Sequence, residues 1–502
     1  MTENEPGKSR SRLIFYPDGE KKGEGMEKTT YKWSTYLKFV VFSLVGIFVF
    51  FINVPFPGYE IQIGIWKWGA VPAQSNVIVS HLTNFLKAAL FTGNFKAMPL
   101  IVWGIGVYSI VDLFILRPDK FWHTTKVAAI FAVFKIVGFG LLCFAMLEIY
   151  LGWHPGFMGW FFEPVPSLSD KSICMFIMNS ILVTISISIP AASLFLPLLV
   201  DYGLVDFVGV LVRPIMRPVF KLPGRAAVIM VSAFLGNFSV GHIAVNDQYK
   251  TGRMTEREAV VIGTSFSTVS VGFLMALANN TGLNERGYWN LYFWTAFLIT
   301  LLVSLIGVRI YPLRQIPDRC YPGVEACPEP LIKKNILKVA WKEALDVAEN
   351  QDPLISRIGY IMKETIGVLG TVASGTAFFA TAGVLLYTYT PIVKWVGYLF
   401  YPFMRISIPK AEAVTACTGA AVSFVEVTIP ALLVTVGEWS LRTRYMMAVI
   451  PVTSIIFLAS FVPCLMATEV PVKFKDMVII WVERMLLSVL ITGVFAVILF
   501  PA

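Results

Sequence analysis

The sequence predicts an all-α polytopic membrane protein, with about nine transmembrane helices and two re-entrant helical hairpins in an inverted repeat. Three observations support this fold class: the composition, a series of long apolar runs, and a repeated pattern of segments. Of the 502 residues, 56% are hydrophobic and 15% are charged, whereas soluble domains contain about 45–50% and about 25%. This composition argues against a soluble enzyme, a disordered scaffold and a nucleic-acid binder.

The N-terminal residues 1–38 are polar and basic without apolar periodicity, so we expect a disordered cytoplasmic tail. The first apolar run, Phe39–Val54, has neither the short basic start nor the cleavage site of a signal peptide, which predicts a retained span. Eight further runs are long enough to cross a bilayer: Met98–Leu116, Val127–Tyr150, Ile173–Val200, Ala259–Ala278, Leu291–Ile310, Ile366–Tyr387, Tyr445–Met466 and Met477–Phe500.

Two other apolar segments are interrupted near their middles by polar residues or glycine. They are Ala226–Val245 and Ala411–Val436, and we expect the hairpins to occupy 225–252 and 409–438. Each is predicted to enter the membrane and turn back, which is tolerated only where protein or a water-filled cavity satisfies the backbone.

The distribution of basic residues indicates the orientation. With the N-terminus inside, most of the 41 lysines and arginines lie on the inner side, as the positive-inside rule requires. The net charge of +9 is then explained by loops that flank the spans. Within the inner loop 311–360, Leu331–Glu349 is predicted to form an amphipathic helix on the membrane surface.

The internal repeat relates the two hairpins. Val208–Arg217 reads VGVLVRPIMR and Val396–Arg405 reads VGYLFYPFMR, with six identical positions at an offset of 188. With a two-residue shift, Phe238 in the first hairpin corresponds to Phe424 in the second, and a basic linker follows each hairpin. Three spans separate equivalent points, so the second copy is expected to lie upside down, as in secondary transporters. The alternative is accidental similarity between apolar segments.

The domains expected from this pattern are an N-terminal tail, a scaffold, two repeats and the loop between them. Their predicted boundaries are 1–38 for the tail, 39–171 for the scaffold spans with interfacial segments, 172–310 for the first repeat, 311–360 for the loop and 361–502 for the second repeat.

The first hairpin and its linker, GNFSVGHIAVNDQYKTGRMTERE, look like a Gate (nucleoside-recognition) domain. Over Phe39–Phe500 the chain resembles the YjiH family of bacterial Gate membrane proteins, and its hairpins are similar to those of concentrative nucleoside transporters. The glutamine that binds the base in those transporters corresponds to Asn237, while their glutamate in the same stretch has no counterpart. The resemblance implies transport across a bacterial cytoplasmic membrane, and a homo-oligomer or a Gate-protein partner.

The hairpin tips are the predicted solute site, because their helix ends and freed backbone groups face the centre of such folds. The alternative for the hydroxyls and Asn237 is that they satisfy the backbone of their own turns. The predicted substrate-binding residues are Asn237, Ser239, His242, Ser423, Glu426 and Thr428, and the coupling-ion candidates are Glu426, His242 and Thr268.

Glu426 is the strongest of these candidates because it interrupts the apolar stretch FVEVTIPA. A carboxylate in hydrocarbon costs about 2.5–3.5 kcal/mol on insertion scales, so it should face a cavity or a partner. Glu426 is predicted to bind a coupling proton or sodium ion, or a substrate ammonium. The alternative is a structural salt bridge to Arg405 or Lys410. His242 is either a proton relay or a residue hydrogen-bonded within its hairpin.

We expect structural roles for other polar groups. Asp247 is expected to be solvated or paired with Lys250, and Glu483 and Arg484 in the last span are expected to be paired or to snorkel toward the interface. The hydroxyls in the spans beside the hairpins either line a polar cavity or pack between helices. Cys320 and Cys327 do not have a standard zinc spacing, and we expect no metal and no cofactor.

The predicted function is secondary active transport of a small polar solute, coupled to a proton or sodium gradient. The solute is a nucleoside-like molecule, an amino acid, a small peptide or a cationic metabolite. The alternative is a non-transporting sensor or assembly partner with the same fold. No Walker A, HExxH, CxxC or nucleophile-elbow motif occurs in the sequence, so an enzyme is not expected.

Overall fold

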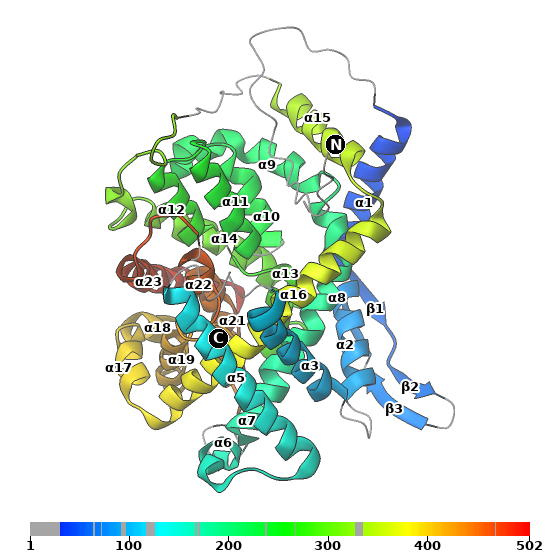
Figure 1. Ribbon diagram of the computed structural model, residues 1–502, viewed down its shortest axis with the longest axis vertical. Helices are drawn as coiled ribbons and strands as arrows, with labels where there is room; N and C mark the ends of the chain where they lie inside the picture. The colour runs from blue at the N-terminus through cyan, green and yellow to red at the C-terminus, as the bar shows by residue number, and fades with distance from the viewer. Residues whose placement is uncertain are drawn as a thin grey trace, which may run out of the picture.

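The computed structural model describes residues 31–501 except 64–65, 72, 92–96, 117–125, 166–167, 169–170, 236–237, 267, 327–334 and 467. Most of the predicted N-terminal tail therefore lies outside the described residues. Helices dominate the fold (Figure 1).

Six helical stretches in the described part are long and apolar enough to cross a membrane, or seven if one bent pair counts as a span. This confirms a multi-pass, predominantly helical membrane protein, while the predicted number of nine spans is not confirmed. Large apolar side chains such as Leu44, Val494 and Ile498 are exposed on them, as expected of surfaces that face lipid. The six are α1 (Trp33–Phe51), α3 (Ala97–Val111) with η1 (Asp112–Leu116), α5 (Lys126–Leu151), α7 (Ile173–Phe176) with η4 (Ile177–Leu182) and α8 (Val183–Val200), α14 (Trp289–Gly307), and α23 (Phe474–Leu499). The bent pair is α16 (Leu354–Tyr389) with α17 (Ile392–Tyr398), at 80°.

The count differs because two predicted spans are interrupted. Ala259–Ala278 is divided into α12 (Glu256–Ser265) and α13 (Val271–Asn280), and Tyr445–Met466 into α21 (Leu441–Ser454) and α22 (Phe461–Met466). The Ser270 hydroxyl caps α13 by accepting from Phe273 N at 3.2 Å, which favours a new helix start. Ile455, at φ 50°, ends α21. The two breaks occur at corresponding positions of the repeat.

The two predicted hairpins are present as adjacent helix pairs. The first is α10 (Ala226–Leu235) with α11 (Phe238–Lys250), and the second is α19 (Lys410–Val422) with the short α20 (Ile429–Leu433). Shorter helices lead into both hairpins, and α9 packs on α10 as α17 packs on α19. These lead-in elements are α9 (Leu204–Ile215) with η5 (Met216–Phe220), and α17 with α18 (Tyr401–Ser407). The order of segments is thus the same in both halves.

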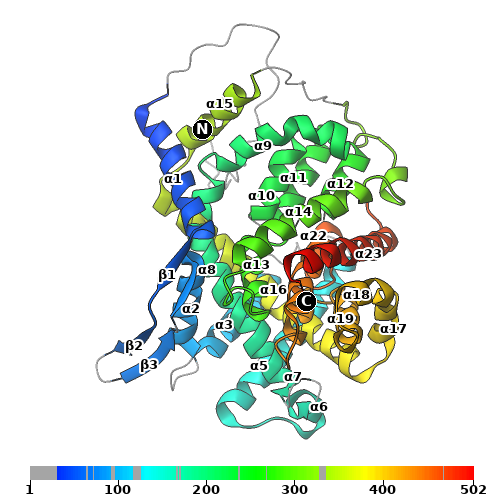
Figure 2. The same cartoon turned by 180° about the vertical axis from the view of Figure 1, so that it is seen from behind.

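The chain also contains short strands that the sequence analysis did not predict. β1 (Asn53–Phe56) pairs with β4 (Gln74–Val77), and β2 (Tyr59–Ile63) with β3 (Trp66–Val71), all antiparallel. Figure 2 shows this ribbon at the edge of the molecule beside α2 (Ile78–Phe91). A third pair of strands joins β5 (Pro164–Val165) to β6 (Lys171–Ser172). It follows η2 (Gly156–Met158) and α6 (Gly159–Phe162) along the chain.

The predicted surface helix in the central loop begins at Ile336 and ends at Asn350 (α15), after η6 (Leu313–Gln315). The helix α15 packs on α9 and α1 (Figure 1), and small residues of α15 such as Ala344 are buried. Two hydrogen bonds of 2.9 and 2.7 Å join the Arg213 guanidinium to the Glu343 carboxylate, and Arg357 donates to Asp201 at 2.9 Å. The central loop is therefore anchored to the first repeat.

We expect Glu343→Gln to lower the free energy of unfolding by about 1–3 kcal/mol, because the largely buried Arg213 loses its ionic partner. Chemical denaturation in detergent measures this change. The exposed Glu349 on the same helix provides the control, and Glu349→Gln should change stability by less than about 0.5 kcal/mol. Equal effects of both substitutions would contradict the anchoring role.

Candidate solute site between the two hairpins

The tip of the second hairpin lies against the break between α21 and α22. The carbonyls of Phe424 and Val425 accept hydrogen bonds from the amides of Leu458 and Ala459, at 2.8 and 3.2 Å. Neither pair belongs to a helix, so each segment satisfies backbone groups that the other leaves open. This pairing joins the tip to the middle of the interrupted span.

Glu426 lies at this tip and is only 1% exposed. Its Oε1 accepts from the amide and the hydroxyl of Thr428, at 3.2 and 2.9 Å, while Oε2 is buried without a hydrogen-bond partner among the described residues. The alternative of a salt bridge is wrong for this structure, since Arg405 instead donates to the Ile408 carbonyl at 3.3 Å. One carboxylate oxygen of Glu426 therefore remains available.

The other predicted residues of the second tip form local contacts. The Ser423 hydroxyl donates to the Ala420 carbonyl at 2.6 Å, within its own turn. The Thr428 hydroxyl holds the Glu426 carboxylate. Among the three candidates of this tip, only Glu426 has an unsatisfied polar atom.

At the first tip, Asn237 lies outside the described residues, and Ser239 lies in the first turn of α11. His242 on the same helix is 1% exposed, with its Nε2 3.0 Å from the Gly263 carbonyl of α12. Because a carbonyl only accepts, Nε2 carries the proton and Nδ1 remains an acceptor. Nδ1 is buried without a partner among the described residues.

Aromatic contacts bring the first hairpin to the same break as the second. The His242 and Phe461 rings lie edge to face at 4.8 Å between centroids, and Phe238 lies 6.0 Å from Phe457. The two predicted hairpin sites therefore converge on segment 455–461, with His242 on one hairpin and Glu426 on the other. The sequence analysis did not predict this shared segment.

The hydroxyls beside the breaks divide into two groups. The hydroxyls of Thr264 and Thr453 donate to carbonyls of their own helices, at 2.7 and 3.1 Å, as the hydroxyls of threonines inside helices commonly do. Thr268 lies inside the first break, 1% exposed, and its hydroxyl has no partner among the described residues. Thr268 therefore has a free ligand atom at an interrupted helix.

Arg484 was not predicted as a site residue. It is 1% exposed in α23, and it donates to the Thr453 carbonyl at 2.6 Å and to the Ser304 hydroxyl at 3.3 Å. The expectation that Arg484 pairs with Glu483 or snorkels is wrong, because Arg484 is buried and contacts Thr453 and Ser304 instead. The available signal was a charged residue inside a long apolar helix, which usually marks a functional position.

At the C-terminal end of the first hairpin, Lys250 donates to Glu469 at 2.6 Å. Asp247 is exposed, which agrees with the solvated alternative for this residue and not with a pairing to Lys250. The Tyr321 hydroxyl also donates to Glu469, and the Glu469 amide donates to the Asn246 side chain at 2.8 Å. Hydrogen bonds from Lys250 and Tyr321 hold the pKa of Glu469 below its usual range. Glu469, in the segment before α23, thus joins the end of the first hairpin to the central loop.

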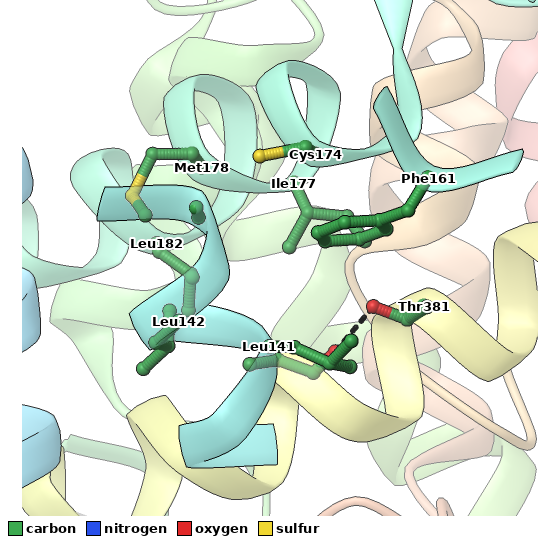
Figure 3. Close-up of a pocket in the computed structure, with 10 residues that line it drawn as sticks. Leu141, Leu142, Phe161, Cys174, Ile177, Met178, Leu182 and Thr381 are labelled. Carbon is green, nitrogen blue, oxygen red and sulfur yellow. Dashed lines mark hydrogen bonds between the residues drawn. The ribbon is translucent and has the colours of Figure 1, made fainter. Parts of the chain in front are cut away.

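A separate pocket between α5, α6, η4 and α16 is almost entirely apolar (Figure 3). Phe161, Cys174 and Met178 line it, and its one hydroxyl, on Thr381, donates to the Ala377 carbonyl at 2.6 Å. None of the predicted site residues contributes to its wall. This pocket offers no free polar group to a polar solute.

Acidification should open the contact between Lys250 and Glu469. A lowered folded-state pKa means that the contact is intact at neutral pH and is lost as pH falls through that pKa. Amide hydrogen exchange of segment 466–473, corrected for intrinsic rates, should therefore accelerate at acidic pH in the wild type. In Lys250→Met it should be fast already at neutral pH, whereas the exposed control Lys475→Met should behave as wild type. A pH-independent wild-type exchange would contradict the role of this ion pair.

Comparison with known proteins shows a similarity that includes the first hairpin. Residues 182–284 match the family model described as Gate, nucleoside recognition. An uncharacterized protein of Alkalihalophilus pseudofirmus is 27% identical over 465 residues, covering 90% of this chain and 92% of its own length. A structure of CNTnw in an outward-facing state is 14% identical, with 92% of this chain and 98% of that chain covered and a TM-score of 0.38. Another, in an inward-facing substrate-bound state, is 13% identical, with coverage of 83% and 97% and a TM-score of 0.37. Residues 182–284 of the chain are thus similar to the family described as Gate, nucleoside recognition.

Proposed function

We propose that this protein is a secondary active transporter of a small polar solute, working by alternating access. The observation that carries the proposal is the convergence of both hairpins on segment 455–461, with a buried Glu426 oxygen left unpaired. Secondary transporters place their sites where interrupted helices of two inverted repeats meet. The matching order of segments and the two corresponding breaks support this reading.

The proposed solute site consists of the hairpin residues Asn237, Ser239, His242, Ser423, Glu426 and Thr428. The Glu426 carboxylate is suited to sugar hydroxyls or to an ammonium group, since it accepts hydrogen bonds and carries negative charge. The Gate match favours a nucleoside-like solute. An amino acid, a small peptide and a cationic metabolite offer the same donors.

We assign coupling to a proton or a sodium ion at Glu426, His242 or Thr268. Each of the three has a buried polar atom without a partner among the described residues. A carboxylate and an imidazole can exchange a proton, whereas a hydroxyl and a carboxylate oxygen can bind sodium. The hairpin-bearing repeats, 172–310 and 361–502, would move against the scaffold 39–171 during the cycle.

The proposed location is a bacterial cytoplasmic membrane, with the N-terminus inside. The grouping of Lys250, Tyr321 and Glu469 at one end supports the orientation, because the topology derived from the basic residues puts all three inside. A homo-oligomer or a Gate-protein partner belongs to the same proposal.

A second candidate function is a sensor or assembly partner that does not transport. The observation that favours it is the packing of Phe238 against Phe457 and Phe461, which fills space between the first hairpin and the second broken span. In a transporter these rings must separate during the cycle, whereas in a structural component they remain packed.

Thermal unfolding of the purified chain with solute panels tests the site. Nucleosides, amino acids, dipeptides and polyamines are compared with and without sodium, at two pH values. A solute that binds only the folded state stabilises it by about 2.7 kcal/mol at a hundredfold excess over Kd. We expect a response to one solute class that is lost in Glu426→Gln and kept in Glu438→Gln, where the glutamate is exposed.

Uptake into vesicles separates the two functions. Transport of the stabilising solute with a pH profile altered in Glu426→Gln supports proton coupling at this residue, and sodium dependence lost in the same variant supports sodium coupling. Stabilisation without uptake would favour the sensor. An unchanged response in Glu426→Gln would overturn the assignment of the site.

A further inference from the structure

A chain of polar contacts crosses the centre of the molecule and ends on both interrupted spans. The Arg484 guanidinium donates to the Thr453 carbonyl at 2.6 Å and to the Ser304 hydroxyl at 3.3 Å. The Ser304 hydroxyl in turn donates to the Ser265 carbonyl at 2.8 Å. Ser265 is the last residue of α12, and Thr453 lies in the last turn of α21.

These two carbonyls occupy equivalent places in the repeat. Each carbonyl lies in the last turn of the helix that precedes a break, α12 for Ser265 and α21 for Thr453. Arg484 therefore reaches one break directly and the other through a single hydroxyl. The side chain of Arg484, on the last helix, thus contacts the helix end before one break and is linked through Ser304 to the helix end before the other.

The ends of these two helices need positive charge. The last carbonyls of a helix have no intrahelical donor and carry the negative end of the helix dipole. Where a span is interrupted inside a membrane, water is not freely available to satisfy them. Secondary transporters bind sodium ions or protons at carbonyls of this kind.

Arg484 itself lacks an anionic side chain as partner. It is 1% exposed, and no carboxylate within the described residues lies at ion-pair distance from it. Its contacts are a carbonyl and a hydroxyl. Its Nε is buried and has no hydrogen-bond partner among the described residues. The charge of Arg484 is thus directed at the helix ends and not at an acidic residue.

We propose that Arg484 is a tethered cation that takes the place of a bound monovalent cation at the junction of the two interrupted spans. The proposal rests on the proposed transport function, which it refines. A coupling ion would then bind elsewhere, at the hairpin candidates Glu426, His242 or Thr268, and not between Ser265 and Thr453. Arg484 acts as a positioning residue, because it holds both breaks in place without contact to the solute.

Chemical rescue of Arg484→Ala tests the proposal on the full-length protein in detergent. Removing the guanidinium leaves the Thr453 carbonyl without its donor, while the Ser304 hydroxyl keeps only its bond to the Ser265 carbonyl, so the melting temperature should fall by several degrees. Guanidinium ion at millimolar, non-denaturing concentration should restore most of this loss in the variant and leave the wild type unshifted. Urea at the same concentration should restore nothing, because it has the shape but not the charge.

Arg444 provides a matched control. It also donates to backbone carbonyls, those of Trp439 and Thr281, but at a partly exposed position near the start of α21. Arg444→Ala should show no rescue by guanidinium, because water can reach the vacated carbonyls. Equal rescue of both variants would overturn the proposal, as would a failure of guanidinium to restore Arg484→Ala.

Two further variants decide the case in which Arg484→Ala yields no folded protein. Arg484→Lys keeps a cation, and Arg484→Met keeps an apolar side chain of similar length. Folded protein with Lys but not with Met supports the tethered cation. Folded protein with both, or with neither, would overturn it. Because the readout is folding, failure here is distinct from failure to transport a solute.

Discussion

Backbone polar groups buried in an apolar environment must find partners within the protein, and the centre of this molecule is arranged around that constraint. Two spans stop and restart halfway, so each presents carbonyls and amides that no helix satisfies. Arg484, Ser304 and the second hairpin tip supply the missing partners. The last helix and the second hairpin are therefore tied to the breaks by the same requirement.

The candidate site is a consequence of this arrangement. Phe424 and Val425 can pair with Leu458 and Ala459 only if the hairpin tip enters the core to the depth of the break. That placement buries Glu426, which follows directly in the chain. The first hairpin approaches the same segment through His242 and Phe238, which use ring contacts and a carbonyl of α12.

The ion pairs away from the centre of the molecule differ in burial from the polar contacts of Arg484. The ion pair of Lys250 with Glu469 is exposed, so solvent screens it and it suits a contact that forms and breaks. The pair of Arg213 with Glu343 is largely buried, so it suits a lasting anchor of the central loop. The central contacts of Arg484 are buried, and breaking them leaves charge in a poorly solvated place.

The sequence by itself determined the helical membrane class, the two hairpins, the repeated order of segments and the surface helix in the central loop. These features are local, since composition, run length and spacing within a segment encode them. Only the tertiary structure decided that two apolar runs are interrupted, that the strands β1 to β4 form, and that Lys250 and Arg484 have partners other than Asp247 and Glu483. The physical reason is that hydropathy measures the transfer of a side chain, whereas a break or an ion pair depends on which distant group satisfies the backbone or the charge. Ser304 and Thr453 contact Arg484 from other helices, at separations of 180 and 31 residues in the chain. A pattern within one segment cannot show which residues of other segments make such contacts.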